Sequence, residues 1–441
     1  MRILYDCFSC SPYYGSDEGI GWNWPFYMRQ YHEVWALVRK DRKPDIDRYC
    51  KEHKIRDIHF VYVDVPDCIN IYYKNFAKGK NGTLDFLLYQ FMWQFPAYKV
   101  AKKLHKKYHF DMVHHVSTND FRLIGRMDKI GIPFIIGPIG GAQETPKALQ
   151  YYVREHRKNE ELRSILNRVM TSFPGYKKAL NKADKVFFSN EETMTYLLPK
   201  IKNRDKCEIL TEVACKREDI FNIPVKAKAE ETEAVFMTDN TENPKQVKEK
   251  HNENNIFTMM WAGRMEYRKG LELLFDVLDT LPEDLQWKLI LCGDGSESAH
   301  YKELVSNKTY SEKVIFKGKL PYEEVQQVYE KADIFVFPSL RETTGTVIIE
   351  AMAHGIPVIA IKQGGAAEVI TEKTGFLVEG KTKEEIIENY AAKIEECIKA
   401  PCQLKEMQKD ILTRVHNLYT WDKKIEYMDA VYNENAFVRK N

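Results

Sequence analysis

The feature that most constrains the fold is a regular alternation of short apolar runs and helical segments in the second half of the chain. Segments between the runs have helical spacing, as in 269–281, where leucines recur every three or four residues. Buried parallel strands that alternate with helices form a doubly wound α/β domain. The predicted strands of this domain are 256–263, 287–295, 313–318, 333–339, 357–361 and 374–378.

The first half repeats the same alternation with less regularity. A chain of 441 residues is too long for one hydrophobic core and suits two domains. We therefore predict an α/β fold with two Rossmann-like doubly wound domains that face a central cleft. Residues 224–255 are charged and have few apolar side chains, which indicates a linker or an insertion. The predicted ranges are 1–215 for the first domain, 216–255 for the linker and 256–417 for the second domain.

Composition excludes several classes of protein. The net charge of +2 provides no overall field that would attract nucleic acid. Nine scattered cysteines do not form a disulfide framework, so we expect a reducing cytoplasm. We expect no signal peptide and no transmembrane helix, because no apolar run has the length. Cys7 and Cys10 form a C-x-x-C pair, but a glycine-containing loop follows it instead of a helix.

Two loops of the second domain have the composition of an anion site. In such sheets, ligands bind beyond the carboxyl ends of the strands. "AGRMEYRKG" places Arg264 and Lys269 between a strand and its helix, where the helix dipole adds to their charge. In "SLRETTGTVIIE", Thr344 or Thr346 is expected to cap the next helix, and Gly345 lets a ligand approach the backbone. This combination suits a diphosphate without a metal, although solvated surface cations are the simpler alternative.

Two glutamates frame the second of these loops. Glu350 lies about one turn into the predicted helix, inside an apolar stretch where an unpaired carboxylate would be costly. A carboxylate can bind the two vicinal hydroxyls of a ribose as a pair. Glu342 precedes the helix, nearer the expected phosphates, where a sugar ring could bind. A buried polar contact within the domain is the alternative for Glu350.

The second half resembles the retaining, GT-B-fold glycosyltransferases of family 4, the glycosyl transferases group 1. The matching stretches are "GRMEYRKG", "CGDGSE", "KGKLPYEEVQQVYEKADIFVFPS" and "ETTGTVIIEAMAHGIPVIAIKQGGAAEVI". The resemblance implies that Arg264, Lys269 and Glu342 are catalytic. It implies that Arg264 and Lys269 hold the donor pyrophosphate, Glu350 the ribose and Glu342 the donor sugar. The implied donor-binding set also contains Gly263, Gly293, Thr343, Thr344, Gly345 and Thr346.

The first half resembles a bacterial branch of this family that acts on polysaccharide, lipopolysaccharide or glycolipid. The resemblance implies that Gly21 of "GSDEGIGWNW" approaches the donor phosphates. It also implies that the last segment, 418–441, is a helix that crosses back to the first domain. Many members have a cleft histidine at the position of Val116; for the neighbouring histidines, a packed core role is the alternative. The residues implied on the acceptor side are Glu18, Gly19, His114 and His115.

The implied reaction transfers a hexose from a UDP- or GDP-sugar to a hydroxyl of a glycan or lipid-linked acceptor with retention of configuration. No metal and no other cofactor is expected. The "DID" triplet at 45–47 follows Pro44 in a probable helix start, whereas a metal-binding D-x-D ends a strand. Two rivals stay open: a nucleotide-sugar epimerase of the same fold and a non-catalytic transferase-like subunit. A NAD-dependent oxidoreductase ranks lower, because the first glycine loop has no clean G-x-G-x-x-G.

Two segments, 68–110 and 151–170, mix aromatic or apolar residues with lysine and arginine. One interpretation is a solvated helix face beside ordinary core aromatics; the other is a surface that binds anionic lipid. The expected partners are a nucleotide sugar donor, a glycan or lipid-linked acceptor and an anionic membrane surface, without nucleic acid. The expected location is cytoplasmic, with peripheral binding to the inner face of the plasma membrane as an option.

Overall fold

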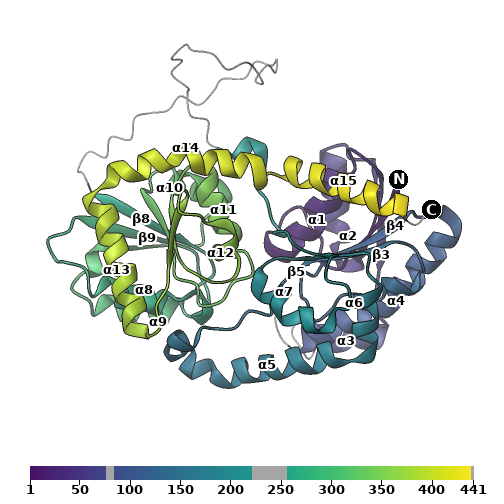
Figure 1. Cartoon of the computed structure of the whole chain (residues 1–441), viewed down its shortest axis with the longest axis horizontal. Helices are drawn as coiled ribbons and strands as arrows, with labels where there is room; N and C mark the ends of the chain where they lie inside the picture. Colours follow the sequence, from purple (N-terminus) through teal and green to yellow (C-terminus); the bar gives the residue numbers. More distant parts are fainter. Residues whose placement is uncertain (76–83, 221–255, 439–441) are drawn as a thin grey trace, which may run out of the picture.

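A computed structural model describes residues 1–75, 84–220 and 256–438. Two parallel sheets lie in two domains placed side by side (Figure 1). The N-terminal sheet has seven strands in the order β3-β2-β1-β4-β5-β6-β7. The strands are β1 (Arg2–Cys7), β2 (Glu33–Arg39), β3 (Ile58–Val63), β4 (Met112–Ser117), β5 (Phe134–Ile139), β6 (Lys185–Phe188) and β7 (Cys207–Ile209).

Helices cover both faces of this sheet, so its central strands are buried on both faces. Every residue of β4 and β5 is buried, so neither face of these strands can meet water. The covering helices are α1 (Ser16–Met28), α2 (Lys43–Glu52), α3 (Asp67–Asn75), α4 (Leu84–Tyr108), α5 (Arg157–Ser172), α6 (Pro174–Lys182) and α7 (Glu191–Leu197). The alternation of strands and helices that the sequence predicts for this half is confirmed.

Helix α1 begins earlier than the sequence predicts. The glycine-rich stretch 9–21 was expected to be a loop, but α1 starts at Ser16, directly after Gly15. Asp17 and Glu18 occupy the first turn, where acidic side chains favour a helix N-terminus. Gly21 therefore lies inside the helix, where a Cβ atom would stand 1.8 Å from the carbonyl oxygen of Ser9. Close packing between α1 and the loop after β1 explains this glycine.

The C-terminal sheet has six strands in the order β10-β9-β8-β11-β12-β13. The strands are β8 (Phe257–Ala262), β9 (Trp287–Cys292), β10 (Val314–Gly318), β11 (Ile334–Phe337), β12 (Val358–Ile361) and β13 (Gly375–Val378). The helices are α8 (Leu271–Leu278), α9 (Ser298–Ser306), α10 (Tyr322–Tyr329), α11 (Thr346–Ala353), α12 (Gly364–Val369), α13 (Lys383–Lys399) and α14 (Pro401–Leu418). The strand positions agree with the sequence prediction.

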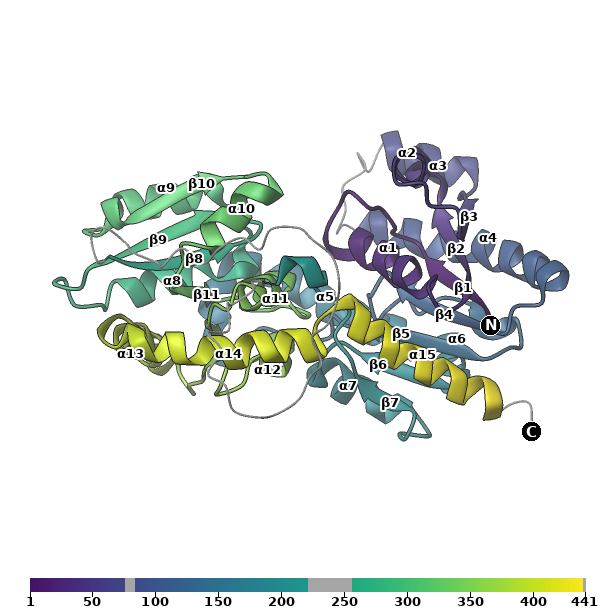
Figure 2. The same cartoon turned by 90° about the horizontal axis from the view of Figure 1, so that it is seen from above.

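A helix pair returns the chain from the second domain to the first. Helix α14 runs along the C-terminal domain, and α15 (Trp421–Val438) lies against α1 of the N-terminal domain (Figures 1 and 2). The Tyr432 and Tyr5 hydroxyls are 2.8 Å apart. The predicted domain ranges stay a prediction, and most of the predicted linker, 221–255, lies outside the described residues.

A second connection crosses between the domains on another side. The 3-10 segment η3 (Lys147–His156) buries Leu149, Tyr152 and Val153 in the hydrophobic core of the C-terminal domain. Helix α5 follows at once and ends on the N-terminal domain, where it contacts α6. Figure 1 shows α5 running along the lower edge of both domains. We refer to residues 147–172 as the strap, because they connect the two domains although the sequence places them in the first.

Neither a membrane span nor a metal site was found in the described ranges. Among residues 1–75, 84–220 and 256–438, no helix is long and apolar enough to cross a bilayer. No group of three His, Cys, Asp or Glu side chains in these ranges could hold a metal ion. Asp47 of the "DID" triplet lies in α2 and pairs with Lys43 at 2.5 Å. The expectation of a metal-free reaction stays a prediction.

Candidate active site

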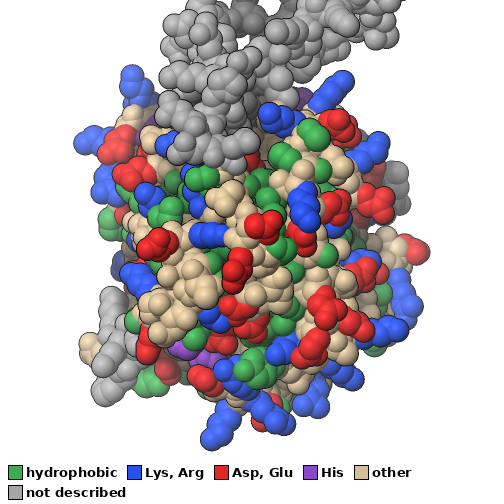
Figure 3. Space-filling view, turned by 90° about the vertical axis from the view of Figure 1, so that its left-hand side faces the viewer, with side chains coloured by type: hydrophobic (Ala, Val, Ile, Leu, Met, Phe, Trp, Pro, Cys, Tyr) green, Lys and Arg blue, Asp and Glu red, His purple; other side chains and the backbone are tan. Residues whose placement is uncertain are grey.

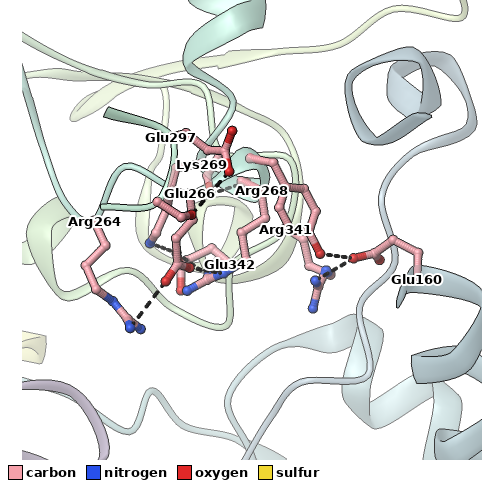
Figure 4. A network of polar contacts seen from close by, with 11 residues as sticks. Glu160, Arg264, Glu266, Arg268, Lys269, Glu297, Arg341 and Glu342 are labelled. Atoms are coloured by element: carbon pink, nitrogen blue, oxygen red, sulfur yellow. Dashed lines mark hydrogen bonds and ion pairs between the residues drawn. The ribbon is translucent and has the colours of Figure 1, made fainter. Parts of the chain in front are cut away.

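Two loops of the C-terminal domain bring opposite charges together at the candidate site. The loop after β8 carries Arg268 and Lys269, and the loop after β11 carries Glu342. The Lys269 ammonium group forms an ion pair with the Glu342 carboxylate, and Arg268 Nη1 lies 3.5 Å from the same oxygen. Figure 4 shows these side chains converging. Two residues predicted as catalytic, Lys269 and Glu342, are therefore in direct contact.

The two loops can approach each other because of a glycine. Gly270 has a φ of 71°, and a Cβ atom there would stand 2.1 Å from the carbonyl oxygen of Pro338. The backbone amide of Leu340 donates to the carbonyl of Arg268 at 2.8 Å. A larger residue at position 270 would separate the loops and, with them, the ion pair.

The charged side chains of the site differ in how closely a partner of opposite charge neutralises them. Burial raises the pKa of Glu342, but Lys269 and Arg268 outweigh it and hold the pKa below its usual value. The Glu342 carboxylate is therefore ionised at neutral pH. Arg264 differs, because its side chain is 70% exposed and its ion pair with Glu266 spans 3.2 Å. Figure 4 shows Arg264 pointing away from the Lys269–Glu342 pair, so its charge can still attract an anion.

Helix α11 begins beside this pair. Gly345 occupies the N-cap position with a φ of 84°, and no side chain caps the helix. The expectation that Thr344 or Thr346 caps α11 is therefore wrong. A Cβ atom at Gly345 would stand 2.9 Å from the Phe337 ring, which leaves no room for a capping side chain here. The first amides of α11 point out of the helix end, as an anion site requires.

Glu350 is half-buried one turn into α11. Its carboxylate accepts a hydrogen bond from the Tyr329 hydroxyl at 3.3 Å. Burial raises the pKa of Glu350 to about 7; the Tyr329 hydrogen bond opposes this shift and the charge of Asp219 adds to it. Such a carboxylate would gain from hydroxyl donors, because they stabilise its ionised form. This geometry is compatible with the ribose-binding role that the resemblance implies.

The threonines after Glu342 contact the N-terminal domain. Gln143 Nε2 donates to Thr343 Oγ1 at 3.1 Å, and Asn190 Nδ2 donates to the Thr343 carbonyl at 2.9 Å. The Thr344 hydroxyl is buried and donates to Glu212 Oε2 at 2.5 Å. The structure therefore directs the Thr344 hydroxyl into the domain junction. The phosphate-lining role of Thr343 and Thr344 stays a prediction.

The remaining donor-side residues are loop residues of the C-terminal domain. A Cβ atom at Gly293 would stand 1.8 Å from the Gly263 carbonyl oxygen, so the loops after β8 and β9 lie in direct contact. Thr346 is the first residue of α11 and is half-buried. The structure brings Gly263, Gly293 and Thr346 to the same edge of the sheet as Lys269.

The predicted acceptor-side residues of α1 have local partners. Glu18 forms ion pairs with Arg42 at 2.6 Å and with Arg39 at 3.5 Å. A Cβ atom at Gly19 would stand 2.9 Å from the Tyr14 carbonyl oxygen. These contacts give both residues a role within the domain. Their assignment to the acceptor stays a prediction.

The two histidines of β4 are interior residues. His114 Nδ1 lies 2.5 Å from the Tyr432 hydroxyl, and its Nε2 lies 2.6 Å from the Gly137 carbonyl oxygen. Burial lowers the pKa of His114 to about 3, so this ring is neutral. His115 Nδ1 lies 2.8 Å from Asp6 Oδ2. These positions agree with the packed core role that the sequence left open for each histidine.

Several residues at the junction were missed by sequence reasoning. Asp17 is half-buried in the first turn of α1, and burial raises its pKa to about 7; nearby Asp120 raises it further and Arg264 lowers it. Arg268 adjoins Lys269 in the sequence and could have been found there. Glu212 and Glu160 lie in segments without a motif, and only the tertiary fold brings them to the site.

Comparisons with known proteins agree with this arrangement. Residues 239–411 match the family model described as glycosyl transferases group 1. The D-inositol 3-phosphate glycosyltransferase of Corynebacterium diphtheriae is 31% identical over 188 residues, which are 41% of this chain and 43% of that protein. The chain thus spans less than half the length of this curated relative.

Two solved structures share the whole fold. Sucrose-phosphate synthase from Thermosynechococcus elongatus has a TM-score of 0.62 at 17% identity, covering 98% of both chains. Anabaena HepE in complex with UDP has a TM-score of 0.59 at 18% identity, covering 98% of this chain and 100% of the other. The predicted GT-B architecture of two Rossmann-like domains is confirmed. The family match over 239–411 covers the part of the chain that contains Lys269, Glu342 and Glu350.

Proposed function

We propose that this protein is a retaining glycosyltransferase of family 4 that uses a UDP- or GDP-sugar and needs no metal. The observation that carries the proposal is the contact between Lys269 and Glu342 beside the start of α11. A cation, a carboxylate and a helix N-terminus within one site provide for a diphosphate and for the hydroxyls of the attached sugar. The likeness to HepE, a structure that holds UDP, supports the choice of donor class.

Departure of the nucleotide diphosphate places negative charge on the leaving oxygen. Lys269, Arg264 and the α11 dipole are the groups that would stabilise this charge, which is the role of a metal in other transferases. Glu342 would hold the donor sugar and keep Lys269 beside the phosphates. Glu350 would accept hydrogen bonds from the ribose. Each group acts by hydrogen bonding or charge, so none of them has to become covalently attached to the sugar.

The first test is donor binding in the presence of a chelator. A ligand at about one hundred times its dissociation constant should stabilise the fold by about 2.7 kcal/mol. Thermal unfolding is measured with a panel of nucleotides and nucleotide sugars, with and without EDTA. An increase in melting temperature with one nucleotide sugar, unchanged by EDTA, supports the proposal and names the donor. Loss of the shift in EDTA would contradict the metal-free site.

For the acceptor we propose a hydroxyl of a glycan or of a lipid-linked glycan, in cell-surface polysaccharide synthesis. The Corynebacterium relative is named for transfer to D-inositol 3-phosphate, which is a hydroxyl-bearing acceptor with an anionic group. Product analysis after incubation with the donor identified above tests this part. Formation of free sugar or of an epimerised donor, without a glycosylated acceptor, would favour the epimerase rival.

We also propose a cytoplasmic location with peripheral binding to an anionic membrane. Helix α4 supports it, because the solvent-facing side of α4 is apolar in its first half and cationic in its second. No exposed position of α4 is acidic, so this side fits an interface with anionic headgroups. The exposed residues are Leu84, Leu88, Phe91, Phe95, Lys99, Lys102, Lys103, Lys106 and Lys107.

A further inference from the structure

Helix α5 of the strap exposes apolar side chains to solvent and buries polar ones. Three of its apolar side chains, at helical spacing, are exposed to solvent, whereas two of its polar side chains are buried against the protein. Asn167 is 2% exposed and Thr171 is fully buried. A surface helix normally buries its apolar side, but the outward side of α5 has no partner among the residues that the structure describes. The exposed fractions are 43% for Leu162, 49% for Ile165, 49% for Val169 and 58% for Phe173, the residue that follows the helix.

Positive charge surrounds this apolar side. Exposed acidic residues near it are few, and Glu161 is already paired with Arg157 at 2.8 Å. The cations around this side provide the charge complementarity that an anionic bilayer requires. The exposed cations of this region are Arg157, Lys158, Arg168, Lys177 and Lys178.

The outer end of the C-terminal domain has a different surface. Figure 3 shows acidic and basic side chains interspersed over the outer end of the C-terminal domain, with scattered hydrophobic ones between them. A mixed surface of this kind is typical of a face that stays in water. The face that Figure 3 shows therefore lacks the grouped apolar and cationic side chains that the outward side of α5 has.

The inner side of α5 contacts the donor loops. Glu160, in the first turn, accepts a hydrogen bond from the Tyr267 hydroxyl at 2.7 Å and from Arg341 Nη2 at 2.8 Å. Tyr267 lies two residues before Lys269, and Arg341 directly precedes Glu342. Figure 4 shows Glu160 reaching Arg341 from a separate segment. One carboxylate therefore ties together the two loops that form the candidate site.

The strap is fixed at both ends. Its η3 segment is buried in the core of the C-terminal domain, and the Tyr152 hydroxyl donates to Asp276 at 2.6 Å. In its middle, Arg163 Nη2 donates to the Gln143 carbonyl at 2.9 Å, and farther along α5 contacts α6 of the N-terminal domain. A surface that holds α5 in place thus acts on both domains at once.

We propose that the outward side of α5 docks on an anionic bilayer and that Glu160 transmits this docking to the donor site. The bilayer holds α5 in the position in which Glu160 binds Tyr267 and Arg341, so the loops that carry Lys269 and Glu342 are ordered before the donor arrives. Glu160 is a positioning residue in this scheme, because it acts through its neighbours. The second step rests on the proposed transferase function, whereas the docking step rests only on the proposed binding to an anionic membrane.

Docking is tested with the full chain and vesicles of equal parts phosphatidylglycerol and phosphatidylcholine. The wild type is expected to sediment with these vesicles but not with pure phosphatidylcholine. A variant with Leu162→Asn, Ile165→Asn and Val169→Asn should bind at least about tenfold more weakly, because its apolar area is lost. Leu418→Asn is the matched control, since Leu418 is 51% exposed on α14.

Two results would overturn the docking surface. One is equal sedimentation of the wild type and the triple variant. The other is a concentration-dependent dimer in analytical ultracentrifugation that the triple variant abolishes, because a second copy of the chain would then cover α5. Circular dichroism of the triple variant checks that it is folded, and its basal donor binding without vesicles is expected to equal that of the wild type.

Coupling is tested by donor titration with and without vesicles. Anionic vesicles should lower the dissociation constant of the wild type for the donor about fivefold or more, as is usual for linked sites. Glu160→Ala should still sediment with vesicles but lose this gain. Glu160→Gln, which keeps an acceptor oxygen, should retain part of it, and the control Glu161→Ala should retain all of it.

The outcomes separate the two steps. A gain that persists in Glu160→Ala would overturn the coupling. If no nucleotide sugar binds with or without vesicles, the proposed function is wrong and the coupling falls with it, while sedimentation alone still decides the docking surface.

Discussion

At the scale of single residues, the Lys269–Glu342 pair determines the chemistry of the site. The pair is half-buried, so each charge depends on the other for its stability. In the donor complex, Lys269 would also face the leaving phosphate. Removing it takes one cation from the transition state and leaves Glu342 with Arg268 as its nearest cation.

We expect Lys269→Ala to lower kcat by about 10² to 10³, the range for removing one charge-stabilising group. Steady-state kinetics at saturating donor measure this effect. Lys362→Ala is the control, because Lys362 is exposed and pairs with Glu379 at 2.9 Å away from the site. Full turnover of Lys269→Ala would contradict the assignment.

Glu350 predicts a pH dependence of donor binding. Burial raises its pKa to about 7, and ribose hydroxyls bind the ionised form. Below pH 7, a growing fraction of Glu350 is protonated, so the dissociation constant should rise by up to about tenfold per pH unit. Calorimetry between pH 6 and 8 measures it, with a nucleotide sugar as ligand because a terminal phosphate titrates near pH 6. Glu350→Gln should flatten the profile, and a flat profile in the wild type would refute the role.

The same group affects stability in the opposite direction. The pKa of Glu350 is higher in the folded chain than the value of about 4.3 for an unfolded one. Between these values the folded state binds more protons, so its stability falls as pH rises. Glu350 therefore costs stability at neutral pH while it awaits a ligand. Because the carboxylate costs stability, its place in the apolar stretch of α11 is explained only if it has a function.

At the scale of elements, the strands were predictable and several helix ends were not. Strands such as 333–339 and 357–361 are buried on both faces, so their apolar runs are visible in the sequence. The start of α1 was not, because Gly19 and Gly21 indicate a loop locally. In the folded chain they lie in a helix, where Gly19 packs on the Tyr14 carbonyl and Gly21 on the Ser9 carbonyl. The strap was missed because η3 buries its apolar residues in a domain to which the sequence order does not assign it.

The packing of Gly345 against Phe337 at the start of α11 can be tested by substitution. Gly345→Ala places a methyl group 2.9 Å from Phe337 on a backbone with a φ of 84°. Gly318→Ala meets a similar φ of 66° but has open space around it. Each variant should lose about 1 kcal/mol of stability from the backbone, and Gly345→Ala should lose roughly 1–3 kcal/mol more from the contact. Urea denaturation measures the difference; equal losses would refute the contact.

At the scale of the whole molecule, the site is shared between domains that sequence analysis treats separately. Two βα units of one domain contain Lys269, Glu342 and Glu350, and two motifs reveal them because each motif lies within a single βα unit. Their supports come from elsewhere: Glu160 from the strap and Glu212 from the end of the first domain. Such contacts join residues more than a hundred positions apart, so no local pattern records them.

Helix α15, the last segment that connects the two domains, contains a buried lysine whose pKa depends on its contacts at the domain junction. Lys424 is 2% exposed and donates to Thr211 Oγ1 at 2.9 Å. Burial lowers the pKa of Lys424 to about 7, and Glu212 opposes this shift. An unfolded lysine titrates near 10.4, so between pH 7 and that value the unfolded state binds more protons. The contribution of Lys424 to stability therefore increases as pH rises from 7, because the folded state no longer has to bury the charge.

We expect Lys424→Met to remove this increase. The stability of the wild type relative to Lys424→Met should grow by about 1–2 kcal/mol between pH 7 and 9, from the shift of its pKa. Urea denaturation at the two pH values measures it, and groups common to both proteins cancel in the difference. Lys423→Met is the matched control, because Lys423 is exposed and pairs with Glu426 at 2.8 Å. If Lys424→Met and Lys423→Met respond alike to pH, Lys424 is not buried against Thr211, and α15 does not join the domains through this contact.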